Sequence, residues 1–193
     1  MRDRTVLITG ATDGIGKQTA LELARMGARV LLHGRDRAKG KAVLAELRAA
    51  TGNERLSLLT ADLASLSQVR DLADEVCASC PRLDALVNNA AVHMPQRQLT
   101  EDGIESTFAI NHLAPFLLTQ LLLDLLKASA PARIVNVSSD AHLGARLDFD
   151  AGRRRRVAPA VLGCQRRVGG ALVLTGSPRR TIRTSFLRRP ESR

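Results

Sequence analysis

The chain has 193 residues, 45% of them apolar, which is enough to bury one hydrophobic core, so a single soluble domain is the default. Residues 1–151 hold 17 Lys and Arg against 18 Asp and Glu, whereas residues 152–193 hold 12 Arg and one acid, Glu191. The formal net charge of +10 therefore describes the tail alone and gives no reason to expect a nucleic-acid-binding surface on the first 151 residues.

Export and metal binding are not expected from this sequence. A strand predicted to begin at Thr5 leaves no room for a signal peptide, and the most apolar run, residues 116–126, is short and interrupted by polar side chains. Cys77 and Cys80 have no second C-x-x-C partner, so we interpret them as free thiols. We expect a cytoplasmic protein with no membrane span and no metal site.

Strand-like and helix-like patterns alternate along residues 5–139. Apolar runs predict strands at 5–9, 28–33, 56–60, 84–89 and 132–139. Helical patterns occupy 15–26, 37–50, 65–79 and a long stretch from 101 to 128. Strands that are apolar on both faces and separated by helices predict an α/β fold with a doubly wound, Rossmann-like parallel sheet, ending after the fifth strand. Ligands of such sheets bind at the carboxyl ends of the strands.

A glycine-rich segment, TGATDGIG at residues 9–16, joins the first strand to the first helix. Gly10, Gly14 and Gly16 allow the backbone to turn tightly and to approach a pyrophosphate at the helix N-terminus, where free N–H groups favour negative charge. The alternative reading is a plain tight turn, which the position at a strand–helix junction makes less attractive.

Two further strand ends carry polar residues. After the second strand, where an acidic residue would hold the 2′-hydroxyl of NAD, Arg35 stands instead and favours the 2′-phosphate of NADP, unless it is only a solvated loop charge. After the third strand, Asp62 is placed to contact an adenine, although it could equally be the N-cap of the next helix.

These motifs together resemble the short-chain dehydrogenase/reductase family, and within it the retinol-dehydrogenase-like branch. The resemblance rests on the glycine segment, D-L at 62–63, N-N-A-A at 88–91, NHLAPFLLT around Asn111 and IVNVSS at 134–139. It implies an oxidoreductase that transfers hydride between NADP(H), favoured over NAD(H), and a carbonyl or alcohol substrate. The cofactor-binding residues it implies are Thr9, Gly10, Thr12, Asp13, Gly14, Ile15, Gly16, Arg35, Asp62, Leu63, Asn89 and Ala90.

The resemblance also implies a catalytic set, of which only part is present. Asn111 would hold a water in a proton relay, and Ser139 would hydrogen-bond the substrate oxygen. The acid/base should be a Tyr assisted by a Lys in a Y-x-x-x-K segment, but the chain has no Tyr and its last Lys is Lys127. Near Gly163, where that segment is expected, only Cys164 and Gln165 resemble it. We therefore expect an impaired or inactive member of the family.

The composition changes near residue 151, which divides the chain into an expected NAD(P)-binding domain at 1–151 and an irregular Arg-rich tail at 152–193. The tail permits three hypotheses: a solvated segment, an arm for nucleic acid or an acidic partner, or the product of a reading-frame shift in a GC-rich gene. The second hypothesis gives the alternative function, a nonenzymatic nucleotide-binding module whose basic tail contacts nucleic acid or an acidic partner. Of these two partners, we do not expect nucleic acid. A sheet that ends at its fifth strand would expose that strand's edge. The resemblance implies that the elements missing after this strand supply much of the family's dimer interface, so we do not expect a family-type homo-oligomer.

Overall fold

The computed structural model describes residues 1–138 and 172–176. It contains one six-stranded parallel sheet in the order β3-β2-β1-β4-β5-β6. The strands are β1 (Thr5–Ile8), β2 (Arg29–Gly34), β3 (Leu56–Thr60), β4 (Ala85–Asn88), β5 (Arg133–Val137) and β6 (Leu172–Gly176). The doubly wound α/β class is confirmed, and each of the five predicted strands is found within about two residues of its expected bounds.

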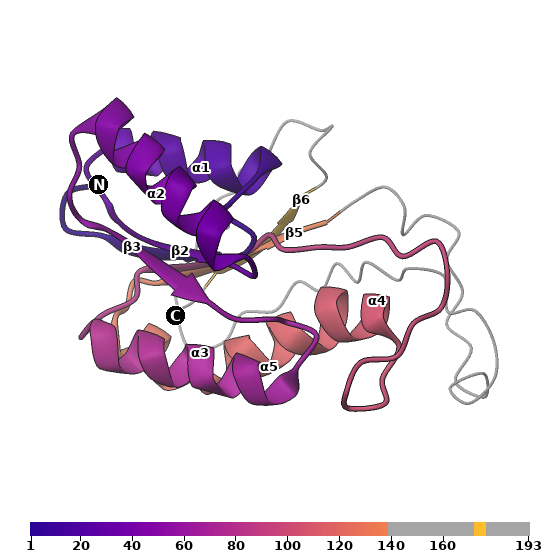
Figure 1. Cartoon of the computed structure of the whole chain (residues 1–193). Helices are drawn as coiled ribbons and strands as arrows, with labels where there is room; N and C mark the ends of the chain where they lie inside the picture. The colour runs from indigo at the N-terminus through magenta and orange to yellow at the C-terminus, as the bar shows by residue number, and fades with distance from the viewer. Residues whose placement is uncertain (139–171, 177–193) are drawn as a thin grey trace, which may run out of the picture.

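Helices cover both faces of this sheet (Figure 1). α1 (Gly14–Arg25) and α2 (Arg37–Thr51) lie on one face, and α3 (Leu66–Ser79) and α5 (Ala114–Leu121) lie on the other. Alternate residues of β1 and β2 serve the two layers, because successive side chains of a strand point to opposite faces. Val6 and Ile8 pack in the cluster below α1 and α2, whereas Leu7 packs in the cluster with α3 and α5.

The sixth strand corrects the expectation that the sheet ends at β5. β6 pairs in parallel with β5, from Arg133 opposite Leu172 to Val137 opposite Gly176, so the outer edge of β5 is paired. The sequence LVLTG is a short apolar run within an Arg-rich segment, and the average composition of that segment hides it. An unpaired parallel strand edge offers a full row of backbone donors and acceptors, which such a run can satisfy.

The predicted long helix from 101 to 128 is divided in the structure. Residues 100–104 form a turn in which Gly103 has φ 72°, and α4 (Ser106–Phe108) begins only after Glu105, whose carboxylate accepts from the N–H groups of Thr107 and Phe108. A π-helical turn, η1 (Ala109–Leu113), precedes α5, and α6 (Leu123–Ala128) follows it. Pro115 lies in the first turn of α5, directly after the π-helical turn.

The amino ends of the central strands are fixed by one buried carboxylate. Asp84 accepts from the Thr5 N–H at 2.8 Å and pairs with Arg4 at 2.6 Å and with Arg82 at 2.5 Å. Its backbone carbonyl accepts from the Arg133 N–H, so the residue connects β1, β4 and β5. Burial raises the pKa of Asp84, but the hydrogen bonds from Arg82, Thr5 and Arg4 outweigh it and hold the pKa below its ordinary value.

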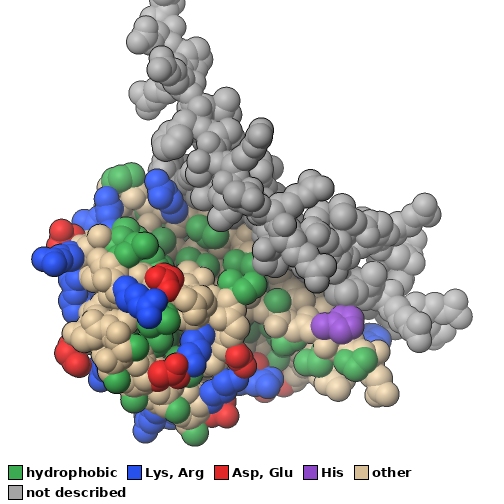
Figure 2. All heavy atoms as spheres, turned by 90° about the horizontal axis from the view of Figure 1, so that it is seen from above, with side chains coloured by type: hydrophobic (Ala, Val, Ile, Leu, Met, Phe, Trp, Pro, Cys, Tyr) green, Lys and Arg blue, Asp and Glu red, His purple; other side chains and the backbone are tan. Residues whose placement is uncertain are grey.

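Charges of both signs are interspersed over the face formed by α1 and α2 (Figure 2). Lys17 of α1 pairs with Glu46 of α2 at 2.7 Å, and Glu22 pairs with Arg25 at 2.8 Å. No helix of the described residues has both the length and the apolar character needed to cross a membrane.

Candidate functional site

The glycine segment lies at the carboxyl end of β1, next to the end of β4. This is the point at which the strand order reverses, because β2 follows β1 on one side and β4 lies on the other. Open parallel sheets bind ligands in the crevice at such a switch point. The sequence prediction therefore placed the segment at the position in the fold that is best suited to a nucleotide.

Neither Gly10 nor Gly16 has room for a side chain. A Cβ on Gly16 would lie 2.3 Å from the Gly10 carbonyl oxygen and 2.5 Å from Asn89 Nδ2. A Cβ on Gly10 would lie 2.9 Å from Ala90 Cα, and Gly10 has φ 64°. Backbone from α1, β1 and β4 thus approaches more closely than any other residue type permits.

The first turn of α1 presents backbone donors at this place. Asp13 is the N-cap, and its carboxylate accepts from the Gly14 N–H at 2.8 Å. The Lys17 N–H donates to the Asp13 carbonyl, which leaves the N–H groups of Ile15 and Gly16 without an intrahelical acceptor. A phosphate is the ligand that such free N–H groups and the helix dipole favour. The residues present therefore fit the pyrophosphate of a dinucleotide.

Asp13 does not leave an uncompensated negative charge beside these donors. Its second carboxylate oxygen pairs with Lys39 Nζ at 2.6 Å. The hydrogen bond from Lys39, followed by that from the Gly14 N–H, lowers the pKa of Asp13. Asp13 was predicted as a cofactor-binding residue, and in the structure its carboxylate is used to cap α1 and to hold Lys39 of α2.

Thr9 and Asn89 connect the two strand ends to one another. The Thr9 hydroxyl accepts from the N–H groups of Asn89 and Ala90, both at 3.0 Å. In return the Asn89 carboxamide donates to the carbonyls of Thr9 at 2.9 Å and Gly10 at 3.2 Å. These polar groups are thus engaged with backbone, and their contribution is to hold the loops after β1 and β4 together.

Arg35 follows β2 and is exposed. Its neighbour Gly34 packs against the glycine segment, because a Cβ on Gly34 would lie 2.4 Å from Thr12 Cγ2. Gly34 is therefore required for the close approach of the end of β2 to Thr12. NAD-binding sheets carry an acidic residue at the end of the second strand, and in this chain position 35 is Arg.

Asp62 lies after β3, where it forms a turn rather than capping the next helix. Its carboxylate accepts from the Ala64 N–H at 2.9 Å, and its own N–H donates to the Gln68 side chain at 2.8 Å. Ser65 is the N-cap of α3, so the alternative reading of Asp62 as that cap is wrong. Leu63 is buried in the core cluster beneath α3, which leaves only its backbone available to a ligand.

Asn111 lies in the π-helical turn and exchanges two hydrogen bonds with Val92. Its Nδ2 donates to the Val92 carbonyl, and its Oδ1 accepts from the Val92 N–H, both at 2.8 Å. The carboxamide therefore fixes the loop that follows the N-N-A-A motif. Sequence reasoning missed this partner, because Val92 and Asn111 are 19 positions apart and no spacing rule marks the contact.

The end of β5 brings polar groups close to the end of β4. Asn88 Nδ2 donates to Asn136 Oδ1 at 2.8 Å and to Thr119 Oγ1 at 3.2 Å. Asn88 Oδ1 and the hydroxyl of Ser138 are buried and have no hydrogen-bond partner within residues 1–138 and 172–176. Ser139, together with residues 140–171 and hence the expected position of the Y-x-x-x-K segment, lies outside the described residues.

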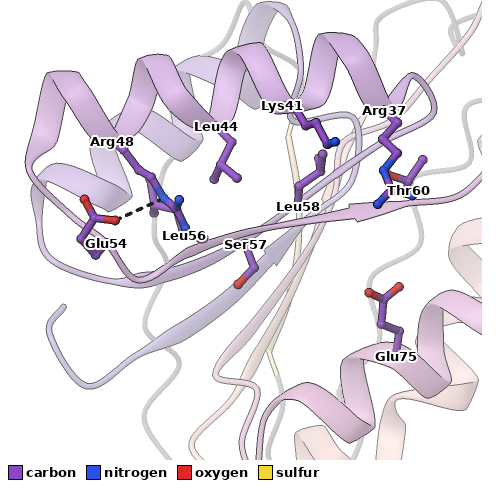
Figure 3. Close-up of a pocket in the computed structure, with 10 residues that line it drawn as sticks. All are labelled: Arg37, Lys41, Leu44, Arg48, Glu54, Leu56, Ser57, Leu58, Thr60 and Glu75. Atoms are coloured by element: carbon purple, nitrogen blue, oxygen red, sulfur yellow. Dashed lines mark hydrogen bonds and ion pairs between the residues drawn. The ribbon is translucent and has the colours of Figure 1, made fainter.

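A second depression lies at the outer edge of the sheet and is separate from this crevice (Figure 3). It has a volume of about 590 Å³ and is lined by residues of α2, β3 and α3, among them Arg37, Lys41 and Glu75. Arg48 and Glu54 pair across 3.6 Å at one end of it. None of its lining residues was predicted as a site residue, and its mixed charges indicate no particular ligand.

The comparisons with known proteins agree with the motifs. Residues 4–147 match the family model described as short chain dehydrogenase. The chain belongs to the short-chain dehydrogenase family. It is 50% identical over 147 residues to retinol dehydrogenase 13 of Homo sapiens, covering 76% of this chain and 44% of that protein. It is also 50% identical over 149 residues to dehydrogenase/reductase SDR family member 13 of Bos taurus, covering 77% of this chain and 39% of that protein.

Solved structures share the fold of this chain. A protein from Mycobacterium Paratuberculosis superposes with a TM-score of 0.70 at 40% identity, covering 82% of this chain and 55% of that one. The RhlG/NADP active-site complex of Pseudomonas aeruginosa superposes with a TM-score of 0.67 at 32% identity, covering 83% and 61%. The chain thus spans less than half the length of the two curated relatives above and little more than half of these structures. The predicted family and its retinol-dehydrogenase-like branch are confirmed.

Proposed function

We propose that the chain binds a nicotinamide dinucleotide in the crevice between β1 and β4, with NADP(H) preferred over NAD(H). The observation that carries this proposal is the close packing of Gly16 against Gly10 and Asn89 at the first turn of α1. The N–H groups of this turn have no intrahelical acceptor and are therefore available to a phosphate. In this arrangement the N–H groups of Ile15 and Gly16 hold the pyrophosphate. Thr9, Gly10 and Asn89 keep the two loops at the required separation.

Arg35 supplies the proposed preference for NADP(H). Arg35 is exposed and directly follows Gly34, which packs against Thr12 of the glycine segment, and its planar guanidinium suits a 2′-phosphate. NADP is named in the description of the Pseudomonas aeruginosa complex, and NADPH in that of a short chain dehydrogenase from Escherichia coli CFT073, which is 32% identical with a TM-score of 0.66. We propose that Asp62, which follows β3, contacts the adenine.

The reaction proposed for the family pattern is hydride transfer between NADP(H) and a carbonyl or alcohol substrate. Asn111 would position a water, and Ser139 would hydrogen-bond the substrate oxygen, as the family resemblance implies. The phenol that would exchange the proton is missing, because the 193 residues contain no Tyr, and no Lys follows Lys127. We therefore propose that this chain binds the cofactor and does not turn it over.

Competition between the two cofactors tests the preference. The chain has no Trp and no Tyr, so the emission of NADPH and NADH can be titrated without the protein fluorescence those residues normally contribute. We expect NADPH to bind at least about tenfold more tightly than NADH, which corresponds to one charge-assisted interaction. Arg35→Ser should remove that difference while leaving NADH binding unchanged. Equal affinities in the unaltered protein would contradict the role of Arg35.

Turnover is tested separately with the same preparation. Incubation of NADP with a panel of primary and secondary alcohols should give no NADPH above the rate without protein. Steady NADPH production that is lost in Gly14→Val would show that a group other than Tyr exchanges the proton, and would overturn the proposed inactivity.

A second candidate function is a nonenzymatic nucleotide-binding module whose tail contacts an acidic partner or nucleic acid. It is favoured by one observation, the 12 Arg and single acid of residues 152–193. Retention of nucleic acid by the purified protein through a salt gradient, with a steep dependence on salt, would support it. Release of the nucleic acid already at low salt would contradict nucleic-acid binding by the tail.

A further inference from the structure

His33 is a buried polar side chain in an otherwise apolar strand. It is 2% exposed, and it follows Val30, Leu31 and Leu32 of β2, none of which is exposed at all. A polar group at such a position is unfavourable unless it is hydrogen-bonded. The imidazole has two partners, which come from different loops: the Gly10 N–H lies 3.4 Å from Nδ1, and the Ala61 carbonyl oxygen lies 3.1 Å from Nε2.

These partners determine the protonation of the ring. Gly10 N–H is a donor, so Nδ1 must offer a lone pair, and Ala61 O is an acceptor, so Nε2 must carry the proton. Only the neutral Nε2–H tautomer satisfies both. Burial lowers the pKa of His33. The hydrogen bond to Ala61 and the negative charge of the nearby Asp62 carboxylate both raise this pKa, but by less than burial lowers it.

The ring thereby joins the glycine segment to the turn after β3. The backbone of His33 adds a second connection, because its carbonyl accepts from the Ala11 N–H at 2.8 Å. Two consecutive N–H groups of the glycine segment, those of Gly10 and Ala11, are therefore held by one residue. A substitution at position 33 preserves the backbone bond and removes only the two side-chain bonds, so the side chain can be tested alone.

We propose that His33 is a positioning residue that holds the glycine segment and the Ala61–Asp62 turn at the separation a dinucleotide requires. The two segments lie at the carboxyl ends of β1 and β3, on either side of β2. That the ligand is a dinucleotide rests on the proposed function, whereas the bridge that the two hydrogen bonds of His33 form between the segments does not. His33 acts on the site through the Gly10 N–H and the Ala61 carbonyl, and we propose no direct contact between its side chain and the ligand.

Three variants separate the two bonds. His33→Leu fills the site and removes both, His33→Asn keeps an acceptor near Nδ1, and His33→Gln keeps a donor that reaches Ala61. We expect the dissociation constant for NADH to rise roughly tenfold in His33→Leu and less in either amide variant. Val43→Ala, which removes buried volume beneath α2, is the control for general destabilisation, and its affinity for NADH should be unchanged.

The pH profile separates positioning from a merely structural role. NADH is the probe because it lacks the 2′-phosphate, which would itself titrate near pH 6. In the unaltered protein NADH binding should weaken only as the pH falls through the pKa of folded His33, which burial holds below the ordinary value of about 6.5, because a protonated Nδ1 cannot accept from Gly10. The profile should be flat in His33→Leu over the same range. A wild-type affinity and a wild-type pH profile in His33→Leu would overturn the proposal.

Amide hydrogen exchange in the protein without cofactor tests the His33 bridge independently of whether a dinucleotide binds. The Gly10 N–H should exchange at least about tenfold faster in His33→Leu than in Val43→Ala, once both rates are corrected for global stability. If NADH does not bind to the unaltered protein but this difference is found, the bridge stands and the dinucleotide proposal fails. Equal exchange rates at Gly10 would contradict the bridge whatever the binding result.

Discussion

Gly16 and Asn89 lie so close that a Cβ atom on Gly16 would come within 2.5 Å of Asn89 Nδ2. Gly16 belongs to the first turn of α1, and Asn89 follows β4, so the contact spans the switch point of the sheet. The Asn89 amide is held there by the carbonyls of Thr9 and Gly10 and has no freedom to withdraw. The start of α1 is thereby fixed against the loop after β4.

Gly16→Ala should lower the free energy of unfolding by about 3 kcal/mol, because the new methyl group meets backbone that cannot move. Gly40→Ala is the matched control, since it is also a buried helical glycine but its Cβ would meet only the Leu58 side chain, at 2.6 Å. The gain in helix propensity of about 1 kcal/mol should offset the adjustment of Leu58. Urea unfolding of both variants makes the comparison, and equal losses would show that the Gly16 contact is not rigid.

Asp84→Asn should destabilise the fold by about 2 kcal/mol at neutral pH, since it removes the charge that satisfies Thr5 and the two arginines. The folded-state pKa of Asp84 is lowered, so its contribution is present above the unfolded pKa of about 3.8 and is lost as the pH falls through the folded value. The stability difference between Asp84→Asn and the unaltered protein should therefore shrink below about pH 4. A difference that stays constant down to pH 2 would contradict this reading of the pKa.

Asn111→Ala should cost roughly 2 kcal/mol, because both hydrogen bonds to Val92 disappear and the Val92 backbone groups lose their partner. Gln120→Ala, on the exposed side of α5, controls for the loss of an amide from this helical region. Amide exchange should accelerate at Val92 in the first variant only. Protection of Val92 that is unaffected by Asn111→Ala would show that the π-helical turn does not depend on this pair.

The order and type of the elements could be predicted from sequence because local patterns determine them. Val30, Leu31 and Leu32 form an uninterrupted apolar run that only a doubly covered strand explains, and the structure buries all three. The predicted start of the long helix at residue 101 was wrong. The helical periodicity of the sequence extends through residues 100–104, which form a turn at Gly103, and Glu105 then caps the start of α4. The strand β6 was missed because its five residues, LVLTG, form a strand by pairing with the edge of β5, which is not a local property of the sequence.

The position of the site could be predicted, whereas the partners of its side chains could not. The strand-to-helix position of Gly10, Gly14 and Gly16 is visible in the sequence. The bonds of Asp13 to Lys39, of Asn111 to Val92 and of His33 to Ala61 join residues 19 to 28 positions apart, and no spacing rule marks them. His33 had one available signal, which is a polar residue within the apolar run of β2.

Titration of NADPH against the unaltered protein, Gly14→Val and Gly52→Val tests the central claim most directly. Gly14 and Gly52 have φ values of 48° and 64°, and neither has an atom within 4 Å of an added Cβ, so both variants carry a similar backbone strain. Gly14 lies at the start of α1, and Gly52 lies at the far end of α2. We predict saturable binding of one NADPH per chain that is lost in Gly14→Val and retained in Gly52→Val. Absence of binding to the unaltered, folded protein, or equal binding to all three, would contradict a dinucleotide site at the glycine segment.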